Sequence, residues 1–302
     1  MILHHFDMSP FAEKARLALG LKQLAWQSVE IPLVMPKPKL TGLTGGYRKT
    51  PVLQIGADIY CDTQRIALEL DRRFPDPPLF PHGDAGLGIA LAHWSDSAFF
   101  EPGAGLSMGV NTELPEPLLN DRKAFFEFMD FDRLPAELPH LWTQVRARAS
   151  LVNRQLADGR AFVHGERPGW ADICAYFPLW MVRMQIGVRA DAALAPFTHL
   201  APWEARVAAI GHGQRSALDA DDAWVVARDS EPAVETAVDD DDPLGLAVGQ
   251  SVTVAPDDYG RDPVHGELAV LTVDDVCVIR RTDTLGRVAV HFPRAGYRVT
   301  AA

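Results

Sequence analysis

The order of short apolar strands and amphipathic helices in the first 75 residues most limits how this chain can fold. ILHHF is strand-like and runs into Ser9 and Pro10, where a segment with helical apolar spacing begins. WQSVEIPL is typical of a second strand. TPVLQIG and ADIYC predict two strands that turn at Gly56 and Ala57, and TQRIALELDRRF predicts an amphipathic helix. This β-α-β, then β-β-α, order predicts an α/β domain over residues 1–77.

The middle of the chain has the pattern of a helical domain. PDPPLFPHGD is rich in proline and predicts a linker after the first domain. Residues 85–212 predict an all-α bundle, because segments such as LWTQVRARASLVNRQLA carry apolar residues at helical spacing. Another helix is expected to begin at Gly169, with Asp172 in its first turn, where a carboxylate can accept free N–H groups.

The last part of the chain changes its pattern twice. Residues 213–243 are polar and end in DDDDP, which predicts an acidic linker or a strap that lies over another domain. Residues 244–302 alternate apolar and polar positions in SVTV, ELAVLTV, VCVIRR, RVAVHF and YRV, with turns rich in Asp and Gly between them. Five short strands in this space predict a small antiparallel β-barrel of SH3-like type at the C-terminus.

Charge and cysteine content exclude several classes of protein. The net charge is -11, and the segment from Leu218 onward holds 17 acidic and 7 basic residues. Neither this acidic segment nor the nearly neutral residues 1–217 offer the positive charge that binding of nucleic acid requires. No apolar run is long enough to predict a membrane span or a secretory signal. The three cysteines form no CxxC pair, which predicts a reducing, cytoplasmic location without disulfides or a zinc site.

Ser9 has two interpretations that the residues alone leave open. Ser at the N-cap followed by Pro at the first helical position is an ordinary helix start. A serine hydroxyl at a helix N-terminus can also donate a hydrogen bond to a ligand thiolate and lower its pKa. The loop reads SPFA, so the two cysteines of a dithiol oxidoreductase are missing, and so is the nucleophile of single-cysteine thiol transfer.

Several motifs together resemble one known family. They are Ser9-Pro10-Phe11-Ala12, Lys14-Ala15-Arg16, Thr50-Pro51-Val52-Leu53, and Asp62-Thr63 followed by Ile66. Their order and spacing are similar to those in the thioredoxin-like domain of the glutathione S-transferase superfamily. The resemblance covers residues 1–75, and the helical stretch at 85–212 fits the second domain of that family. The C-terminal β segment lies outside the usual family architecture.

The resemblance implies a glutathione site. Pro51 would match the family's cis-proline, and Val52 would pair its backbone with the cysteinyl part of glutathione. Asp62 and Thr63 would hold the γ-glutamyl end, although both are also ordinary residues for a helix N-terminus. Ser9 would stabilise the thiolate.

Basic residues before Pro51, namely Lys37, Lys39, Arg48 and Lys49, could face the glycyl carboxylate or be solvated loop charges; of these, Lys49 is assigned to the site. Cys61 is expected to be a buried strand residue. His93, Trp94, Phe99 and Phe100 are candidates for the second-substrate pocket, although aromatic residues at helical spacing more often belong to a core. No metal is expected.

Two functions fit the resemblance. The first is a glutathione S-transferase-type enzyme that binds glutathione and activates its thiol for attack on a small apolar electrophile. The second is a non-catalytic protein of the same fold that acts as a protein-interaction module. The acidic segment and the terminal strands favour this second function. Because the Asp62-Thr63 pair is present, the enzyme is the preferred hypothesis. The family resemblance also implies a homodimer.

Overall fold

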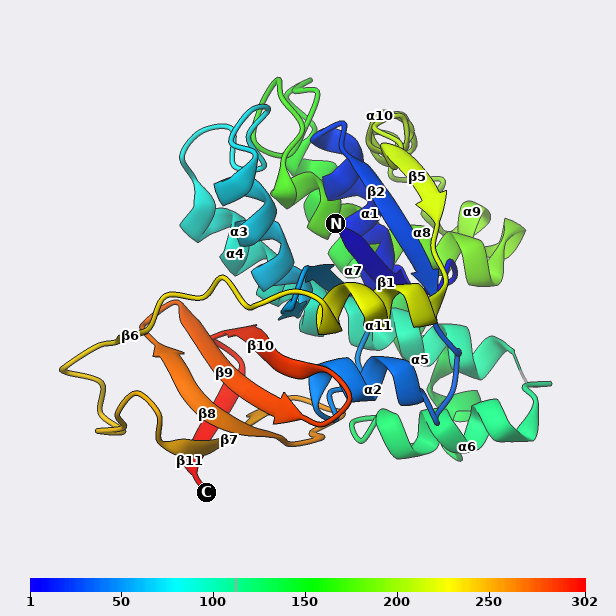
Figure 1. The fold of residues 1–302 in the computed structure, drawn as a ribbon. Coiled ribbons are helices and arrows are strands. Elements are labelled where there is room, and N and C mark those ends of the chain that lie inside the picture. The colour runs from blue at the N-terminus through cyan, green and yellow to red at the C-terminus, as the bar shows by residue number, and fades with distance from the viewer. Residues whose placement is uncertain (112) are drawn as a thin grey trace.

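The computed structural model describes residues 1–111 and 113–302, and Figure 1 shows its arrangement. The first domain has the thioredoxin-like fold that the sequence predicts. Its sheet has the order β4-β3-β1-β2, in which β1 runs parallel to β2 and antiparallel to β3. The elements are β1 (Ile2–His5), α1 (Pro10–Leu21), β2 (Ala25–Glu30), α2 (Pro38–Thr44), β3 (Val52–Ile55), β4 (Asp58–Cys61) and α3 (Thr63–Arg73). The predicted turn between β3 and β4 has Gly56 at φ +63°, a conformation that favours glycine.

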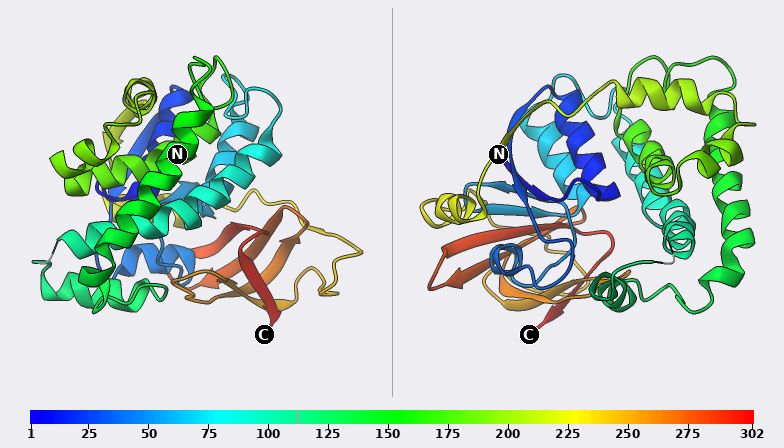
Figure 2. Two further views of the ribbon diagram at one scale, coloured as in Figure 1. Left: turned by 180° about the vertical axis from the view of Figure 1, so that it is seen from behind. Right: turned by 90° about the vertical axis from the view of Figure 1, so that its right-hand side faces the viewer.

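The second domain is the predicted helical bundle. Its helices are α4 (Ala85–Trp94), a π-helical turn (Ser95–Phe99), α5 (Phe100–Val110), α6 (Glu116–Phe125), α7 (Leu134–Gln155), α8 (Trp170–Ile186), α9 (Val188–Leu194) and α10 (Leu200–Ala208). They form a separate layer beside α1 and α3 (Figure 2, right). Gly169 is the N-cap of α8, and its N–H donates to the Asp172 carboxylate at 3.1 Å, so this helix starts where the sequence predicts. Each helix in the described part of the chain is too short or too polar to span a membrane.

The segment predicted as an acidic linker contains regular structure. Its elements are β5 (Gln214–Ala217), α11 (Ala220–Arg228) and β6 (Ala237–Val238). β5 pairs in parallel with β2 and so extends the first domain's sheet at that edge. Trp224 of α11 contacts α2 through a hydrogen bond from its indole N–H to the Lys39 carbonyl, at 2.9 Å. The segment therefore runs back along the first domain.

The C-terminal strands form the predicted antiparallel arrangement, but they are not a detached barrel. They are β7 (Ser251–Pro256), β8 (Val264–Leu271), β9 (Asp275–Thr282), β10 (Gly286–Pro293) and β11 (Tyr297–Ala301), together called the C-terminal β module. β10 pairs in parallel with β4, so the module continues the first domain's sheet (Figure 1). The strands form one sheet in the order β11-β7-β8-β9-β10-β4-β3-β1-β2-β5. The SH3-like barrel that the sequence predicts is not confirmed.

Two hydrophobic cores explain this joined sheet. Leu3 and Leu53 face the first core, which they share with α1, α3 and the helical domain. Ile2, Val52 and Ile59 face the second core together with α2, α11 and the C-terminal β module. Neighbouring residues of a strand point to opposite faces, so the alternating side chains of β1 and β3 supply both cores. The module therefore shares buried side chains with the first domain.

Candidate ligand site

A cavity of about 250 Å³ lies where the two domains and the C-terminal β module meet. The N-terminal ends of α1 and α3 contribute to its lining, as do α5, α6 and the turn between β7 and β8. Five of the residues assigned from the sequence line it: Ser9, Lys49, Pro51, Asp62 and Thr63. They come from three separate segments of the first domain.

Ser9 caps α1 and faces the cavity at the same time. Its side chain is 2% exposed, and its Oγ accepts a hydrogen bond from the Ala12 N–H at 3.2 Å. A hydroxyl can accept one bond and still donate its own proton. The capping role therefore leaves the Ser9 O–H available to an acceptor in the cavity.

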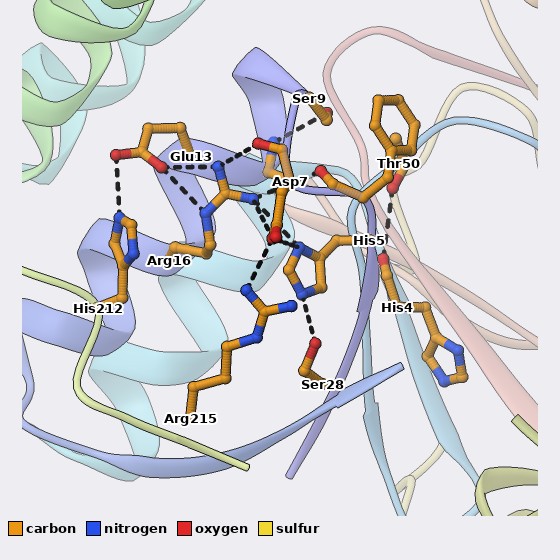
Figure 3. A network of polar contacts seen from close by, with 12 residues as sticks. His4, His5, Asp7, Ser9, Glu13, Arg16, Ser28, Thr50, His212 and Arg215 are labelled. Atoms are coloured by element: carbon orange, nitrogen blue, oxygen red, sulfur yellow. Dashed lines mark hydrogen bonds and ion pairs between the residues drawn. The ribbon is translucent and has the colours of Figure 1, made fainter. Parts of the chain in front are cut away.

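A polar network beneath Ser9 holds the loop between β1 and α1 (Figure 3). Arg16 donates to the Asp7 carbonyl at 2.9 Å, and Arg215 donates to the Asp7 carboxylate at 2.7 Å. Arg16 also lies 3.1 Å from His5 Nδ1. Burial and the Arg16 charge lower the pKa of His5 to about 3, so this imidazole is neutral near pH 7. Residue 215, beyond the helical domain, thus helps to fix the loop that carries Ser9.

Asp62 sits at the N-cap of α3 and meets the C-terminal β module. One carboxylate oxygen accepts the Gln64 N–H at 2.9 Å, and the other accepts the Tyr297 O–H at 3.1 Å. The Tyr297 hydroxyl also lies 3.2 Å from that of Tyr47. The Asp62 backbone has φ +75°, so Asp62 is one of the few non-glycine residues in the left-handed region. The carboxylate is thus held firmly at the mouth of a helix.

Thr63 connects the two domains through a buried lysine. Its Oγ1 accepts a hydrogen bond from Lys14 Nζ at 2.8 Å, and the same ammonium donates to Asp96 at 2.6 Å. Burial lowers the pKa of Lys14, but the Asp96 carboxylate more than offsets this effect and the net shift is upward. Lys14 therefore carries its charge inside the protein and fixes the first residue of α3 against the helical domain.

The structure separates Pro51 from Val52. Thr50 and Pro51 line the cavity, and the peptide bond between them is cis. Val52 does not line it: the side chain is fully buried, and the residue pairs with His4 on one side and Cys61 on the other. Neighbouring strands flank Val52 on both sides, so Thr50 and Pro51, and not Val52, face the cavity.

Lys49 already has partners in the C-terminal β module. Its ammonium donates to Asp258 and lies 4.2 Å from the centre of the Tyr259 ring. Both residues belong to the turn between β7 and β8, and both line the cavity. No sequence motif marks this turn, which reads as an ordinary Asp- and Gly-containing connection. Sequence reasoning therefore missed these two site residues.

Lys37 is a different kind of cation. It is 5% exposed and lines the cavity, yet its ammonium has no ion-pair or hydrogen-bond partner among residues 1–111 and 113–302. Burial and the charges of Arg122 and Arg48 lower its pKa to about 8. The two arginines share one carboxylate, that of Asp121, at 2.6 and 2.8 Å. This end of the cavity is therefore rich in positive charge.

The other residues named from the sequence divide clearly. Phe100 lines the cavity, whereas His93, Trp94 and Phe99 do not. Lys39 pairs with Asp221 and lies away from the cavity. Cys61 is buried, and burial raises the pKa of its thiol well above the ordinary value, as suits a structural residue. The described residues contain no cluster of His, Cys, Asp and Glu that could hold a metal ion.

Comparison with known proteins places this architecture in a family. The family model "Glutathione S-transferase, N-terminal domain" matches residues 3–78, and "Glutathione S-transferase, C-terminal domain" matches residues 124–210. A crystal structure of a GST-like protein from Pseudomonas syringae is 36% identical, has a TM-score of 0.80, and covers 100% of this chain and 98% of its own. The chain belongs to the glutathione S-transferase superfamily.

Other similarities are partial. The tau class glutathione S-transferase MiGSTU from mango, Mangifera indica, is 19% identical, has a TM-score of 0.50, and covers 69% of this chain and 88% of its own. The glutathione S-transferase-like protein ustS of Aspergillus flavus is 32% identical over 145 residues, which are 41% of this chain and 51% of that protein. The match thus spans about half the length of that curated relative. The match to the Pseudomonas syringae structure covers the whole of this chain and therefore includes the C-terminal β module.

Proposed function

We propose that this protein binds glutathione in the cavity and activates its thiol for attack on a small apolar electrophile. The observation that carries the proposal is the convergence of Ser9, Pro51, Asp62 and Thr63 on one cavity at the N-termini of two helices. Helix N-termini favour negative charge, and glutathione offers two carboxylates and a thiolate.

The charges of the cavity support one orientation of the tripeptide. Asp62 receives the γ-glutamyl ammonium, and the free N–H groups at the start of α3 receive the neighbouring carboxylate. Thr50, in place of Val52, offers its backbone to the cysteinyl residue. Lys37 and Lys49 attract the glycyl carboxylate, and Lys37 is favoured because Lys49 is already paired with Asp258.

Ser9 supplies the chemical step. Its O–H donates a hydrogen bond to the glutathione sulfur, which lowers the thiol pKa from about 8.5 and raises the fraction of thiolate near pH 7. The thiol proton goes to water. The sulfur electron pair then forms the new bond to the electrophilic carbon, whose leaving group departs with its bonding electrons. The apolar wall that includes Leu33, Phe100 and Phe126 suits an apolar partner.

Calorimetric titration with glutathione tests the binding half of this proposal. The informative variant is Asp62→Asn, because Asn caps a helix as well as Asp does but carries no charge. We expect its affinity for glutathione to fall about tenfold, the lower range for a hydrogen bond to a charged group. Asp219→Asn, at the N-cap of α11 and outside the cavity, is the matched control. Absence of saturable binding by the wild-type protein would refute the proposal.

The catalytic half is tested with Ser9→Ala. We expect the pKa of bound glutathione, followed by the ultraviolet absorbance of the thiolate, to rise toward about 8.5. Turnover should fall more than affinity, because the hydrogen bond is strongest to the charged sulfur. An unchanged thiol pKa in a folded Ser9→Ala variant would leave Ser9 as a helix cap alone.

A further inference from the structure

The C-terminal β module places an aromatic side chain inside the cavity. Tyr259, in the turn between β7 and β8, is only 8% exposed although the turn lies at the protein surface. Its ring lies 5.2 Å from that of Phe125, 5.6 Å from Phe126 and 6.3 Å from Phe100, measured between ring centres. These rings come from α5, α6 and the residue after α6. Together with Tyr259 they make one wall of the cavity aromatic.

The Tyr259 hydroxyl has no hydrogen-bond partner within the described residues, 1–111 and 113–302. The side chain is mostly buried, but its oxygen is not among the enclosed polar atoms, so the O–H is accessible to solvent beside the cavity that Tyr259 lines. The two other tyrosines of the cavity region, Tyr47 and Tyr297, bond to each other. Tyr259 therefore differs from them in offering a free O–H to whatever occupies the cavity.

The ionisation of this phenol suits a donor. Burial, with the nearby carboxylates of Asp258 and Asp96, raises the pKa of Tyr259 well above its ordinary value. The group stays protonated throughout the neutral range. The carboxylates themselves have other partners: Asp258 is paired with Lys49, and Asp96 with Lys14. These carboxylates are therefore not the acceptors of a hydrogen bond from Tyr259, and its O–H is available to a ligand.

We propose that Tyr259 is a catalytic residue of the C-terminal β module, donating a hydrogen bond to the carbonyl oxygen of a flat, conjugated electrophile. This inference rests on the proposed glutathione transferase function. We infer a flat electrophile from the aromatic wall, because rings and conjugated systems stack on aromatic side chains. We infer a carbonyl group on it from the neutral Tyr259 donor, which can stabilise an oxygen on which negative charge develops.

The reaction this geometry serves is addition of the thiol across a carbon–carbon double bond conjugated to the carbonyl. The thiol proton leaves to water, and the sulfur electron pair forms the carbon–sulfur bond at the β-carbon. The π electrons of the double bond move toward the carbonyl, giving an enolate oxygen that accepts the Tyr259 hydrogen bond. The α-carbon then takes a proton from water. Nothing is oxidised or reduced, and Tyr259 keeps its proton.

The test compares two electrophiles that share a phenyl ring. Benzalacetone carries the conjugated carbonyl, whereas benzyl chloride reacts by displacement and has no oxygen. In Tyr259→Phe, which keeps the ring and its packing, we expect kcat/KM for benzalacetone to fall about 100-fold, as on removal of an oxyanion donor. For benzyl chloride we expect a change of less than about twofold, because no donor is lost on its path. Tyr176→Phe removes a hydroxyl from the core of α8, outside the cavity, and is the matched control.

The outcomes separate this inference from the function beneath it. Calorimetry with glutathione is run on both variants and the wild type. Equal effects of Tyr259→Phe on the two electrophiles, or none on either, would overturn the role of Tyr259 while the transferase function stands. A wild-type protein that binds glutathione and consumes benzyl chloride but not benzalacetone would also overturn it. Failure to bind glutathione and to use either electrophile would refute the transferase function itself.

Discussion

Two buried lysines of the first domain, Lys14 and Lys37, show how the same side chain can serve the fold or the ligand. Lys14 is fully buried and Lys37 is 5% exposed, so exposure hardly distinguishes them. Their surroundings do. Lys14 donates to Thr63 and Asp96 and lies 5.0 Å from the centre of the Trp170 ring. Lys37 lies 5.5 Å from the centre of the Phe6 ring and has no anionic partner within the described residues.

The pKa shifts of the two lysines run in opposite directions for this reason. Burial lowers both, but the carboxylate of Asp96 reverses the shift at Lys14, whereas Arg122 and Arg48 deepen it at Lys37. A buried charge costs free energy unless it is paired. The cost is offset inside the protein at Lys14. At Lys37 the Asp121 carboxylate offsets only part of the cost, and an anion in the cavity would offset more, so this difference separates a structural ion pair from a ligand-binding cation.

The largest expected effect is on stability. Lys14→Met leaves the Asp96 carboxylate without its partner, and we expect the free energy of unfolding to fall by about 3 kcal/mol, as when one member of a buried pair is removed. Lys37→Met removes an unpaired buried charge, so it should raise the free energy of unfolding. Urea denaturation of both variants at pH 7 measures the contrast. Equal losses in the two would show that Lys37 has a partner in solution.

The second effect is on ligand affinity and follows from the proposed orientation of glutathione. Lys37→Met should weaken glutathione binding about 30-fold, within the range for a hydrogen bond between charged groups. Affinity for γ-glutamylcysteine, which lacks the glycyl residue, should hardly change. Titration calorimetry with both ligands gives the comparison, with Lys39→Met as the control outside the cavity. A similar loss for both ligands would place Lys37 elsewhere along the tripeptide.

Much of this fold could be predicted because local patterns determine it. Ser9-Pro10 begins α1, and alternating residues mark the strands on both sides of Gly56, so these elements follow from capping and side-chain periodicity. The C-terminal strands were predictable for the same reason. Their attachment to the first domain was not predictable, because the pairing between β10 and β4 joins residues more than 200 positions apart and leaves no periodic signal. Such a pairing depends on a shared core.

The site was predictable to a similar extent. Ser9, Pro51, Asp62 and Thr63 carry motifs, and the structure brings them together. Lys14 belongs to one of these motifs, but nothing in a single sequence indicates that Asp96 will lie against it. Tyr259 lies in a turn without a motif, so only the attachment of the C-terminal β module to the first domain makes it part of the site.

The dependence of stability on pH sharpens the same comparison. Lys37 has a pKa of about 8 in the folded protein, below its ordinary value of 10.5, so between these two values the unfolded chain binds a proton that the folded one does not. The free energy of unfolding should therefore gain about 1.4 kcal/mol per pH unit from this group across that window. Below pH 8 both states are protonated, and the contribution of Lys37 does not change with pH.

Because other groups titrate in the same range, the measurable quantity is the difference in unfolding free energy between the wild type and Lys37→Met in urea titrations from pH 7 to pH 10. The stability advantage of the variant should shrink as the pH rises above 8. An advantage that stays constant with pH would show that the Lys37 ammonium is paired or hydrated in the folded protein, and the contrast with Lys14 would then fail.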